Sequence, residues 1–238
     1  MKVMKDLEVK GDVITQSDPR YDKARSLFYG GVDKHPAAIV RVANAQDVAR
    51  VVEHARETGA ELAIRSGGHN PLGYSLSEGG IVVDLHDMRR VDVDVPSRTA
   101  RAETGATAVE FATAAGAHGL GVSFGDTGSV GLGGITLGGG VGYLVRQHGL
   151  TIDNLIAAEV VTADGVVRHV DAESEPDLFW RYAAAAAISA SRHASAFAST
   201  RSIPLWAACS CSRPAPSWCT RSSRSPRRRR MSSRRSRT

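Results

Sequence analysis

Glycine is concentrated in one short segment of this 238-residue chain, between residues 128 and 142. Eight of the fifteen residues in that segment are glycine. Because glycine loses more conformational freedom on folding than any other residue, so dense a cluster is costly unless something requires it. Close approach of the backbone to a bulky ligand is one such requirement. The segment therefore predicts a ligand-binding element, and its alternative interpretation is a flexible loop.

A second glycine element follows a short predicted strand, Leu62–Ile64. The strand runs into the turn sequence Arg65–Asn70, which contains Gly67 and Gly68. Small residues in such a turn let consecutive backbone N–H groups converge on an anion, so the turn predicts a phosphate site. Neither element is a P-loop or a Rossmann fingerprint. No Gly-Lys-Ser/Thr triplet stands at P-loop spacing, and no strand of a βαβ unit precedes residues 131–133.

The remaining pattern of residues 1–182 alternates short strands, helices and one hairpin. It predicts strands at 37–42, 62–64, 81–85 and 91–95, helices at 45–58 and 107–118, a hairpin of 157–162 with 166–170, and a helical turn at 176–180. Asn44 and Gly59 are the predicted start and stop of the first helix, and Gly119 stops the second. This mixture of crossover units and hairpins favours an α+β fold over a regular doubly wound sheet.

The charge of the chain changes sign between its two parts. Residues 183–238 contain twelve Arg, all three Cys, no acidic residue and no Gly. Residues 1–182 hold the other 18 basic groups and all 25 acidic groups, so the formal charge of +5 combines −7 in the body with +12 in the tail. An acidic body without cysteine predicts a cytoplasmic protein and gives no reason to expect nucleic acid. No run approaches the roughly 20 apolar residues of a membrane span, so no membrane partner is expected.

Four motifs stand in order between residues 30 and 182. They are Ile64–Asn70 with Gly73-Tyr74, Gly80–Leu85, Val130–Gly134 with Gly138–Gly142, and His148–Leu155. Together they resemble the FAD-linked oxidases of the vanillyl-alcohol oxidase and para-cresol methylhydroxylase (PCMH) class. Within that class they are similar to the branch of berberine bridge enzyme-like and 6-hydroxy-D-nicotine oxidase-like proteins.

The resemblance implies an α+β, two-subdomain FAD-binding domain of the PCMH type. Residues 1–32 would be a lead-in, residues 33–182 the domain, and residues 183–238 a disordered tail. In the class, a substrate domain is encoded after the point where this chain departs from the pattern. The domain is therefore expected to be incomplete, and inactivity of this chain is one open outcome.

The resemblance also implies FAD as the cofactor, with Ser66–Asn70 around its pyrophosphate and a covalent bond from His69 to the flavin 8α-methyl. Outside this motif, His69 would be interpreted as a residue that caps the turn. Some members of the branch use a second link through a Cys at the position of Thr127, and a threonine cannot replace that thiolate, so one link is expected. No catalytic base or metal ligand is assigned. The expected cofactor-binding residues are Arg65, Ser66, Gly67, Gly68, His69, Asn70, Gly73, Tyr74, Thr127, Gly128, Gly131, Gly133, Gly134, Gly138, Gly139, Gly140 and Gly142.

The implied activity is that of an oxidoreductase. Hydride would pass from a C–H beside oxygen or nitrogen to flavin N5, and dioxygen would reoxidise the flavin. The partners would be a small-molecule substrate and dioxygen, and neither the substrate nor the oligomeric state follows from the sequence. The alternative is a nucleic-acid- or anion-binding protein with a basic tail, built on Arg227–Arg230, whose glycine loops are structural.

The tail begins where the resemblance stops. After the helical turn at 176–180 the class continues with G-G-G-G-N-F-G-V, whereas this chain has Ala183–Ser191. One nucleotide string, GCG GCG GCG GCG GCA ATT TCG GCG TC, encodes both when the frame starts at its first or its third base. Codons for Arg192–Ser202, with free third bases, also permit A-T-S-F-R-F-R-L-H-P-V in that shifted frame, which contains the class's next segment, F-R-F-R-L-H-P-V. The hypothesis is that residues from about Tyr182 onward are an out-of-frame translation of a GC-rich gene, which predicts disorder there.

Overall fold

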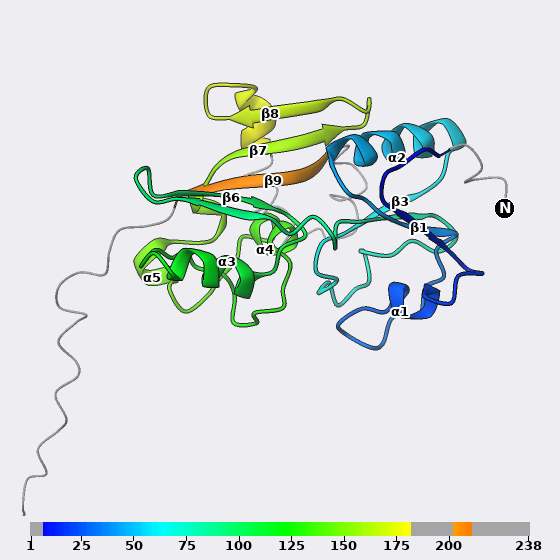
Figure 1. Ribbon diagram of the computed structural model, residues 1–238, viewed down its shortest axis with the longest axis horizontal. Helices are drawn as coiled ribbons and strands as arrows, with labels where there is room; N and C mark the ends of the chain where they lie inside the picture. Colours follow the sequence, from blue (N-terminus) through cyan, green and yellow to red (C-terminus); the bar gives the residue numbers. More distant parts are fainter. Residues whose placement is uncertain (1–6, 182–201, 211–238) are drawn as a thin grey trace, which may run out of the picture.

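The computed structural model describes residues 7–181 and the strand at 202–210. Two β-sheets lie side by side, a four-stranded sheet of order β1-β2-β4-β3 and a five-stranded sheet of order β5-β6-β9-β7-β8 (Figure 1). The elements are β1 (Asp12–Thr15), α1 (Tyr21–Arg25), β2 (Ala38–Arg41), α2 (Ala45–Thr58), β3 (Leu62–Arg65), β4 (Ile81–Asp84), β5 (Val91–Asp94), β6 (Thr99–Glu103), α3 (Ala108–Gly116), α4 (Leu132–Leu137), α5 (Val145–His148), a 3₁₀ turn (Ile152–Asn154), β7 (Leu155–Thr162), β8 (Val167–Asp171) and β9 (Ser202–Ser210).

The first sheet is parallel apart from its edge. Strands β2, β4 and β3 run parallel, and β1 pairs antiparallel with β2. All four residues of β4 are buried, as expected for a parallel strand whose two faces are both covered. Val83 packs with α2 on one face, whereas Val82 packs with Tyr21 and Ala24 of α1 on the other. The predicted strands at 37–42, 62–64 and 81–85 are thus confirmed to within a residue at their ends.

Helix α2 has the predicted boundaries because its two caps are local features of the sequence. The side chain of Asn44 accepts a hydrogen bond from the backbone N–H of Asp47 at 3.0 Å. Gly59 has a φ of +69°, the left-handed conformation that ends a helix and that glycine adopts without strain. Both predictions are confirmed.

The carboxylate of Asp47 also ties the N-terminal residues to this helix. It is completely buried and accepts hydrogen bonds from the backbone N–H groups of Lys10, Gly11 and Ala43, each at 3.0 Å. The sequence pattern does not single out β1 or α1, but Ile14 of β1 is fully buried. Residues 7–32 therefore contribute a strand, a helix and part of the core to the first sheet.

The second sheet contains two hairpins. Strands β5 and β6 pair antiparallel, and β7 pairs with β8 through the predicted Asp-Gly turn, in which Gly165 has a φ of +80°. Helix α3 begins with a reciprocal capping box between Thr107 and Glu110 and buries Phe111 against the sheet. The predicted helix at 107–118 is confirmed, although its regular part ends at Gly116.

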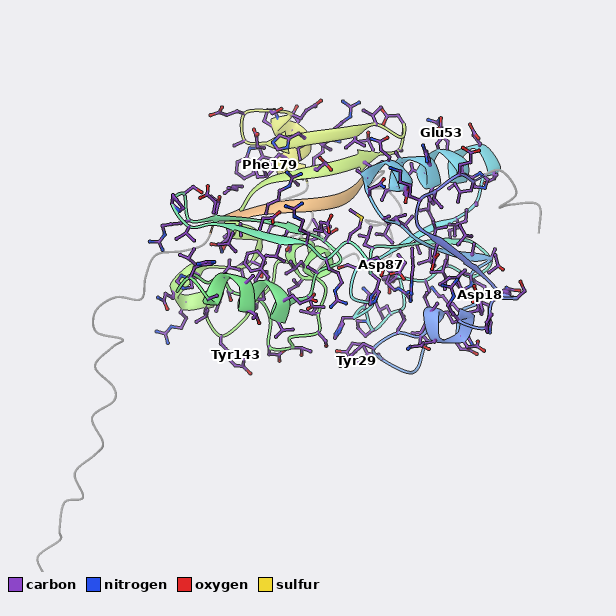
Figure 2. The ribbon with its side chains drawn as sticks, viewed as in Figure 1. Asp18, Tyr29, Glu53, Asp87, Tyr143 and Phe179 are labelled. Carbon is purple, nitrogen blue, oxygen red and sulfur yellow. The ribbon has the colours of Figure 1, made fainter. Side chains whose placement is uncertain are left out.

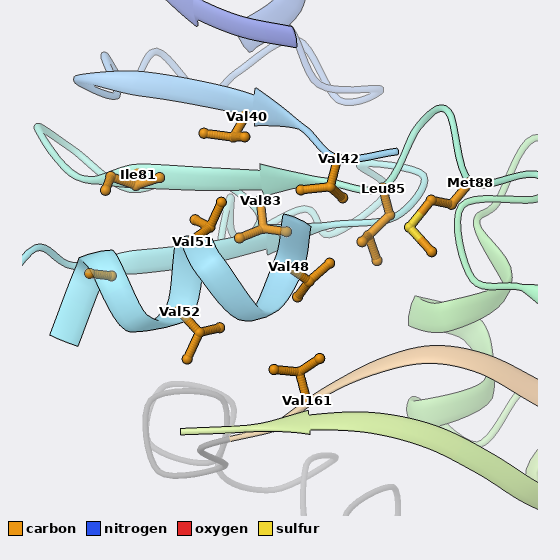
Figure 3. Packing of buried hydrophobic residues seen from close by; sticks show 11 residues of the cluster. Val40, Val42, Val48, Val51, Val52, Ile81, Val83, Leu85, Met88 and Val161 are labelled. Atoms are coloured by element: carbon orange, nitrogen blue, oxygen red, sulfur yellow. The ribbon is translucent and has the colours of Figure 1, made fainter. Parts of the chain in front are cut away.

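The two sheets share one apolar cluster that is centred on α2. Val48 and Val51 of α2 lie over Val83 of β4, and Val161 of β7 belongs to the same cluster (Figure 3). All four side chains are fully buried. The second sheet therefore packs directly on the helix of the first. Within residues 7–181, every helix is too short or too polar to span a bilayer.

The tail differs from expectation at one place. Residues 202–210, expected to be disordered, form β9, which pairs antiparallel with both β6 and β7. The physical reason is that two facing strand edges present unpaired N–H and C=O groups, which any extended segment in reach can satisfy. The rest of the tail, and the hypothesised change of reading frame at Tyr182, lie outside the described residues.

Candidate cofactor site

The two glycine elements, separated by about 60 residues in sequence, meet backbone to backbone. A methyl group added to Gly67 would lie 2.8 Å from the Cα of Gly131, and a methyl group added to Gly131 would lie 2.8 Å from the Cα of Gly67. Carbon atoms pack about 3.5–4.0 Å apart, so only glycine permits this approach at either position. The hydroxyl of Ser66 donates to the backbone carbonyl of Thr104 beneath the contact.

The first part of the second element, residues 128–133, is anchored to residues 104–109. Four backbone hydrogen bonds of 2.8–3.1 Å join residues 104–109 to residues 128–133. Gly133 also packs on the side chain of Thr104, where a methyl group would lie 3.0 Å from its Cβ. Because Ser66 bonds to the same Thr104, both glycine elements are fixed to one short stretch of chain. The segment is therefore an anchored element, and its central residues form the short helix α4.

The side chain of Arg65 is directed into the protein. Its guanidinium donates to Asp84 Oδ1 at 3.1 Å and to Oδ2 at 2.6 Å, and it also donates to the backbone carbonyl of Ala24. Asp84 is completely buried, and Arg41 lies 3.4 Å from its Oδ2. The ion pair therefore positions the end of β3, where Ser66 begins. Arg65 can contribute to a ligand site through its backbone only.

The turn after His69 is held by a hydrogen bond within the turn and by Lys34, which lies just before β2. Asn70 accepts a hydrogen bond from the backbone N–H of Leu72 at 2.9 Å. Gly73 has a φ of +70°, and its carbonyl and that of Leu76 accept hydrogen bonds from Lys34 Nζ at 3.1 Å each. The predicted residues Asn70 and Gly73 thus shape this turn.

Three buried hydroxyl groups lack hydrogen-bond partners within the described residues. They belong to Ser75, Ser77 and Ser123. Ser75 directly follows the predicted residue Tyr74, which is half-buried. A buried hydroxyl without a partner is costly, so a polar ligand atom at Ser75 would satisfy it. Sequence reasoning did not single out Ser75, although its position beside Gly73-Tyr74 was the available signal.

His69 lies between aromatic rings and a hydroxyl group. Its ring stacks on Phe28, with centroids 4.0 Å apart and an interplanar angle of 19°, and meets Tyr29 edge-on at 6.5 Å. Nε2 of His69 lies 3.1 Å from the Oγ of Ser129. Tyr29 marks the lower rim of the region where the two halves of the molecule adjoin (Figure 2). No sequence signal connected Phe28, Tyr29 or Ser129 with His69.

Burial lowers the pKa of His69, and a hydrogen bond with the Ser129 backbone opposes part of that shift. A net lowering means that the imidazole is neutral at pH 7, because its ordinary pKa of 6.5 already lies below that value. A neutral imidazole has one unprotonated nitrogen. His69 is thus in the form that can act as a nucleophile.

Most of the other predicted glycines are required by the packing of the chain itself. Gly68, Gly139 and Gly140 have φ values of +68°, +93° and +74°. Methyl groups would lie 3.1 Å from Val109 at Gly128, 3.2 Å from a backbone oxygen at Gly138 and 2.7 Å from one at Gly142. These glycines therefore fit a structural explanation as well as a functional one.

Gly134 is different, because a methyl group there would meet nothing within 4 Å. It lies inside α4, where glycine is about 1 kcal/mol less favourable than alanine. Packing of the described residues gives no reason for glycine at this position. Open space beside an exposed backbone is the arrangement expected where a ligand lies against the chain.

Thr127 lies at the start of the second element. Its side chain is exposed, and its hydroxyl lies 3.1 Å from Asp126 Oδ1. The site as a whole therefore offers close-packed glycine backbone, a partnerless hydroxyl and a neutral imidazole among aromatic rings. Within the described residues no three metal-binding side chains converge. This set of groups fits a ligand that has both phosphates and a flat ring system, as FAD does.

The family model that matches this chain is an FAD binding domain, over residues 36–171. Among curated proteins, (R)-6-hydroxynicotine oxidase of Paenarthrobacter nicotinovorans is 37% identical over 179 residues, which are 75% of this chain and 39% of that protein. The uncharacterized FAD-linked oxidoreductase YgaK of Bacillus subtilis is 35% identical over 181 residues, covering 74% of this chain and 40% of that protein. The chain thus spans about two fifths of the length of the curated relatives it matches.

Solved structures give the same result for the fold. 6-Hydroxy-D-nicotine oxidase from Arthrobacter nicotinovorans has a TM-score of 0.78 at 30% identity, over 87% of this chain and 43% of that one. Glucooligosaccharide oxidase from Acremonium strictum has a TM-score of 0.71 at 27% identity, over 84% and 40%. That enzyme is described as carrying a 6-S-cysteinyl, 8α-N1-histidyl FAD. The predicted fold, an α+β FAD-binding domain of the PCMH type, is therefore confirmed.

Proposed function

This chain belongs to the FAD-binding domain family of FAD-linked oxidoreductases, and we propose that it binds FAD along its two glycine elements, beside the point where they touch, as part of a flavin-dependent oxidase. The observation that carries this proposal is the backbone contact of Gly67 with Gly131 beside a neutral His69. Ser66–Asn70, Ser75 and the glycines from 128 to 142 would hold the cofactor. Thr127 and the open backbone of Gly134 would lie along it.

The bound flavin would supply a two-electron acceptor for hydride from a C–H beside nitrogen or oxygen, with dioxygen as the final oxidant. The substrate class is a small molecule, in keeping with the names of the oxidase relatives. A basic-tailed nucleic-acid-binding protein, the alternative function, gains no support from these relatives. A cytoplasmic location stays a proposal based on the acidic, cysteine-free body.

We propose that His69 holds the flavin covalently and that the link is single. Partial burial lowers the pKa of His69 and favours the neutral imidazole, whose ring stacks on Phe28 and meets Tyr29 edge-on. Thr127 stands where a second link would require a thiolate, and a hydroxyl cannot supply one. The described residues offer no candidate for a catalytic base, and the chain spans about two fifths of its relatives' length.

The test is to purify the full chain with added FAD and to compare it with His69→Asn and His118→Asn. His118 is an exposed histidine in the turn after α3 and serves as the matched control. The wild type and the control should be yellow and keep flavin fluorescence in the acid-precipitated protein. His69→Asn should bind FAD but release all of it into the acid supernatant. A folded wild-type chain that takes up no flavin would refute the proposed function.

A further inference from the structure

The chain that precedes β2 lies along the turn that carries His69. We call residues 27–34 the N-terminal segment. The backbone N–H of Phe28 donates a hydrogen bond of 3.3 Å to the carbonyl of Gly68, and a methyl group added to Gly68 would lie 3.3 Å from Cδ2 of Leu27. The N-terminal segment therefore meets the turn at the residue directly before His69.

The other end of the N-terminal segment contacts the same turn again. A methyl group added to Gly73 would lie 2.5 Å from Cγ1 of Val32, well inside the distance of about 3.5–4.0 Å at which carbon atoms pack. The ammonium group of Lys34 donates to the carbonyls of Gly73 and Leu76 at 3.1 Å each. The segment is thus tied to the turn at both ends, although it lies before residue 36, where the family match begins.

Phe28 presents its ring to His69 from this anchored backbone. The two rings stack with centroids 4.0 Å apart and planes inclined by 19°, and Tyr29 meets the Phe28 ring edge-on at 5.1 Å. Phe28 is nevertheless 58% exposed. An apolar side chain stabilises the fold in proportion to the area that it buries, so a ring this exposed contributes little to the core. Its stack on the imidazole is therefore the contact that a role for Phe28 has to explain.

Two side chains restrict the imidazole from different directions. Phe28 covers a face of the ring, and the Oγ of Ser129 lies 3.1 Å from Nε2 at one edge. With an aromatic plane 4.0 Å away, rotation about the Cβ–Cγ bond of His69 would drive the edge of the imidazole into the Phe28 ring. Without that plane, the contact with Ser129 alone would have to hold the ring in place.

We propose that Phe28 is a positioning residue that holds the His69 ring in the orientation in which it meets the flavin, which makes the N-terminal segment part of the cofactor site. The inference rests on the proposed function, because the orientation matters only where His69 has a cofactor to meet. A reactive group that is held in one orientation reacts faster than one that rotates freely. Phe28 acts on the reaction only through His69.

The rate that Phe28 should control is that of the proposed covalent bond. In this step a bond forms between an imidazole nitrogen of His69 and the flavin 8α carbon. One proton leaves the carbon and one leaves the imidazole, while two electrons pass through the flavin to dioxygen. The products are the linked cofactor and hydrogen peroxide, and dioxygen is the oxidant that the proposed function already requires.

The first test needs no cofactor. Nuclear Overhauser spectra of the ¹³C-histidine-labelled full chain report contacts between the His69 ring protons and the β protons of Ser129, and His69→Asn identifies the signals. The wild type and Phe28→Tyr, which keeps the stacked ring, should show these contacts. Phe28→Leu keeps an apolar side chain but removes the ring, so it should lose them while the signals of the other histidines stay unchanged. Contacts of equal strength in Phe28→Leu and the wild type would overturn the inference.

The second test follows covalent incorporation of FAD by acid precipitation over time, at several FAD concentrations. In Phe28→Leu the maximal rate at saturating FAD should fall roughly two- to tenfold, the range that corresponds to the loss of one aromatic pair. The FAD concentration that gives half of the maximal rate should stay unchanged. Phe28→Tyr should restore the rate. The control Val166→Ala, at an exposed apolar residue in the turn between β7 and β8, should incorporate FAD at the wild-type rate.

The two measured quantities separate positioning from binding. An unchanged maximal rate in Phe28→Leu would overturn the inference, and if only the half-saturating FAD concentration rose, Phe28 would instead be a binding surface for the cofactor. If the wild-type chain binds no FAD, the proposed function fails, whereas the contacts between His69 and Ser129 still decide whether Phe28 orients the imidazole.

Discussion

Gly131→Ala is the substitution that tests the contact between the two glycine elements most directly. The added methyl would lie 2.8 Å from the Cα of Gly67 and closer still to its nitrogen and to the Oγ of Ser66. Carbon atoms pack about 3.5–4.0 Å apart, so the two backbones would have to separate by roughly 1 Å. The anchor of residues 128–133 on 104–109 opposes that separation.

The expected cost is that of an overpacked site, about 1–3 kcal/mol of unfolding free energy. For a domain of this size that corresponds to a melting temperature lower by roughly 2–12 °C. FAD uptake should fall to background in the same variant, because both elements would lose their common geometry. Thermal unfolding followed by circular dichroism, and flavin absorbance of the purified protein, measure the two effects.

Substitutions at two further glycines distinguish the effect of steric strain on stability from the effect of a blocked ligand surface on FAD uptake. Gly116 and Gly134 both lie in helices, and a methyl group at either would meet nothing within 4 Å. Gly116→Ala, at the last residue of α3 and outside both glycine elements, should raise stability by about 0.5–1 kcal/mol and leave FAD uptake unchanged. Gly134→Ala should also preserve stability but reduce FAD uptake, since the methyl would occupy the space proposed for the cofactor.

A Gly131→Ala protein with wild-type melting temperature and full FAD uptake would refute the proposed role of the contact between the two glycine elements.

Three other predictions concern the ion pair, the capping box and the gene. Asp84→Asn should cost about 3–5 kcal/mol in denaturant unfolding, because it leaves the buried Arg65 guanidinium without its counter-charge; a loss below about 1 kcal/mol would contradict this. Burial alone would raise the pKa of Glu110, but hydrogen bonds led by that from Thr107 lower it overall from 4.5. The ionised carboxylate therefore contributes its full stabilisation above pH 4.5, and this stabilisation is lost as the pH falls through the lowered pKa. The unfolding free energies of the wild type and Glu110→Gln should differ at pH 7 and converge in acid. A difference that is independent of pH would exclude the carboxylate as the cause. Resequencing the gene across the Trp180 codon should show the class's continuation in an adjacent frame, and an uninterrupted frame without it would end the frameshift hypothesis.

Local features of the sequence predicted much of the fold. Helix α2 followed from a cap at Asn44 and a stop at Gly59, each of which acts on its own neighbours. The β7–β8 hairpin followed from Asp164-Gly165, because an Asp-Gly turn between two apolar runs specifies its own connection. In contrast, β6 has the sequence Thr-Ala-Arg-Ala-Glu, with only small apolar residues, and became recognisable as a strand only through its pairing with β5.

The sequence predicted the motifs of the site, but it did not predict how their residues are arranged in space. The order of the glycine elements indicated one ligand but could not show that Gly67 and Gly131 touch, because that contact depends on how two sheets pack. Phe28 and Ser129 lie 41 and 60 residues from His69, and no spacing rule connects them with it. Arg65 stood inside a predicted ligand turn, yet its side chain pairs with Asp84, which the strand register alone places beside it.

The hydrogen bonds from the backbone near residue 10 to Asp47 limit where the chain can be cut without loss of structure. A protease or a truncation that removed residues up to 32 would take away Ile14, Tyr21 and Ala24, and would uncover the face of the first sheet that carries Val82. A fragment that keeps these contacts therefore has to start before Lys10, well upstream of residue 36, where the family match begins. Limited digestion should leave the N-terminal peptide attached for as long as α2 stays folded.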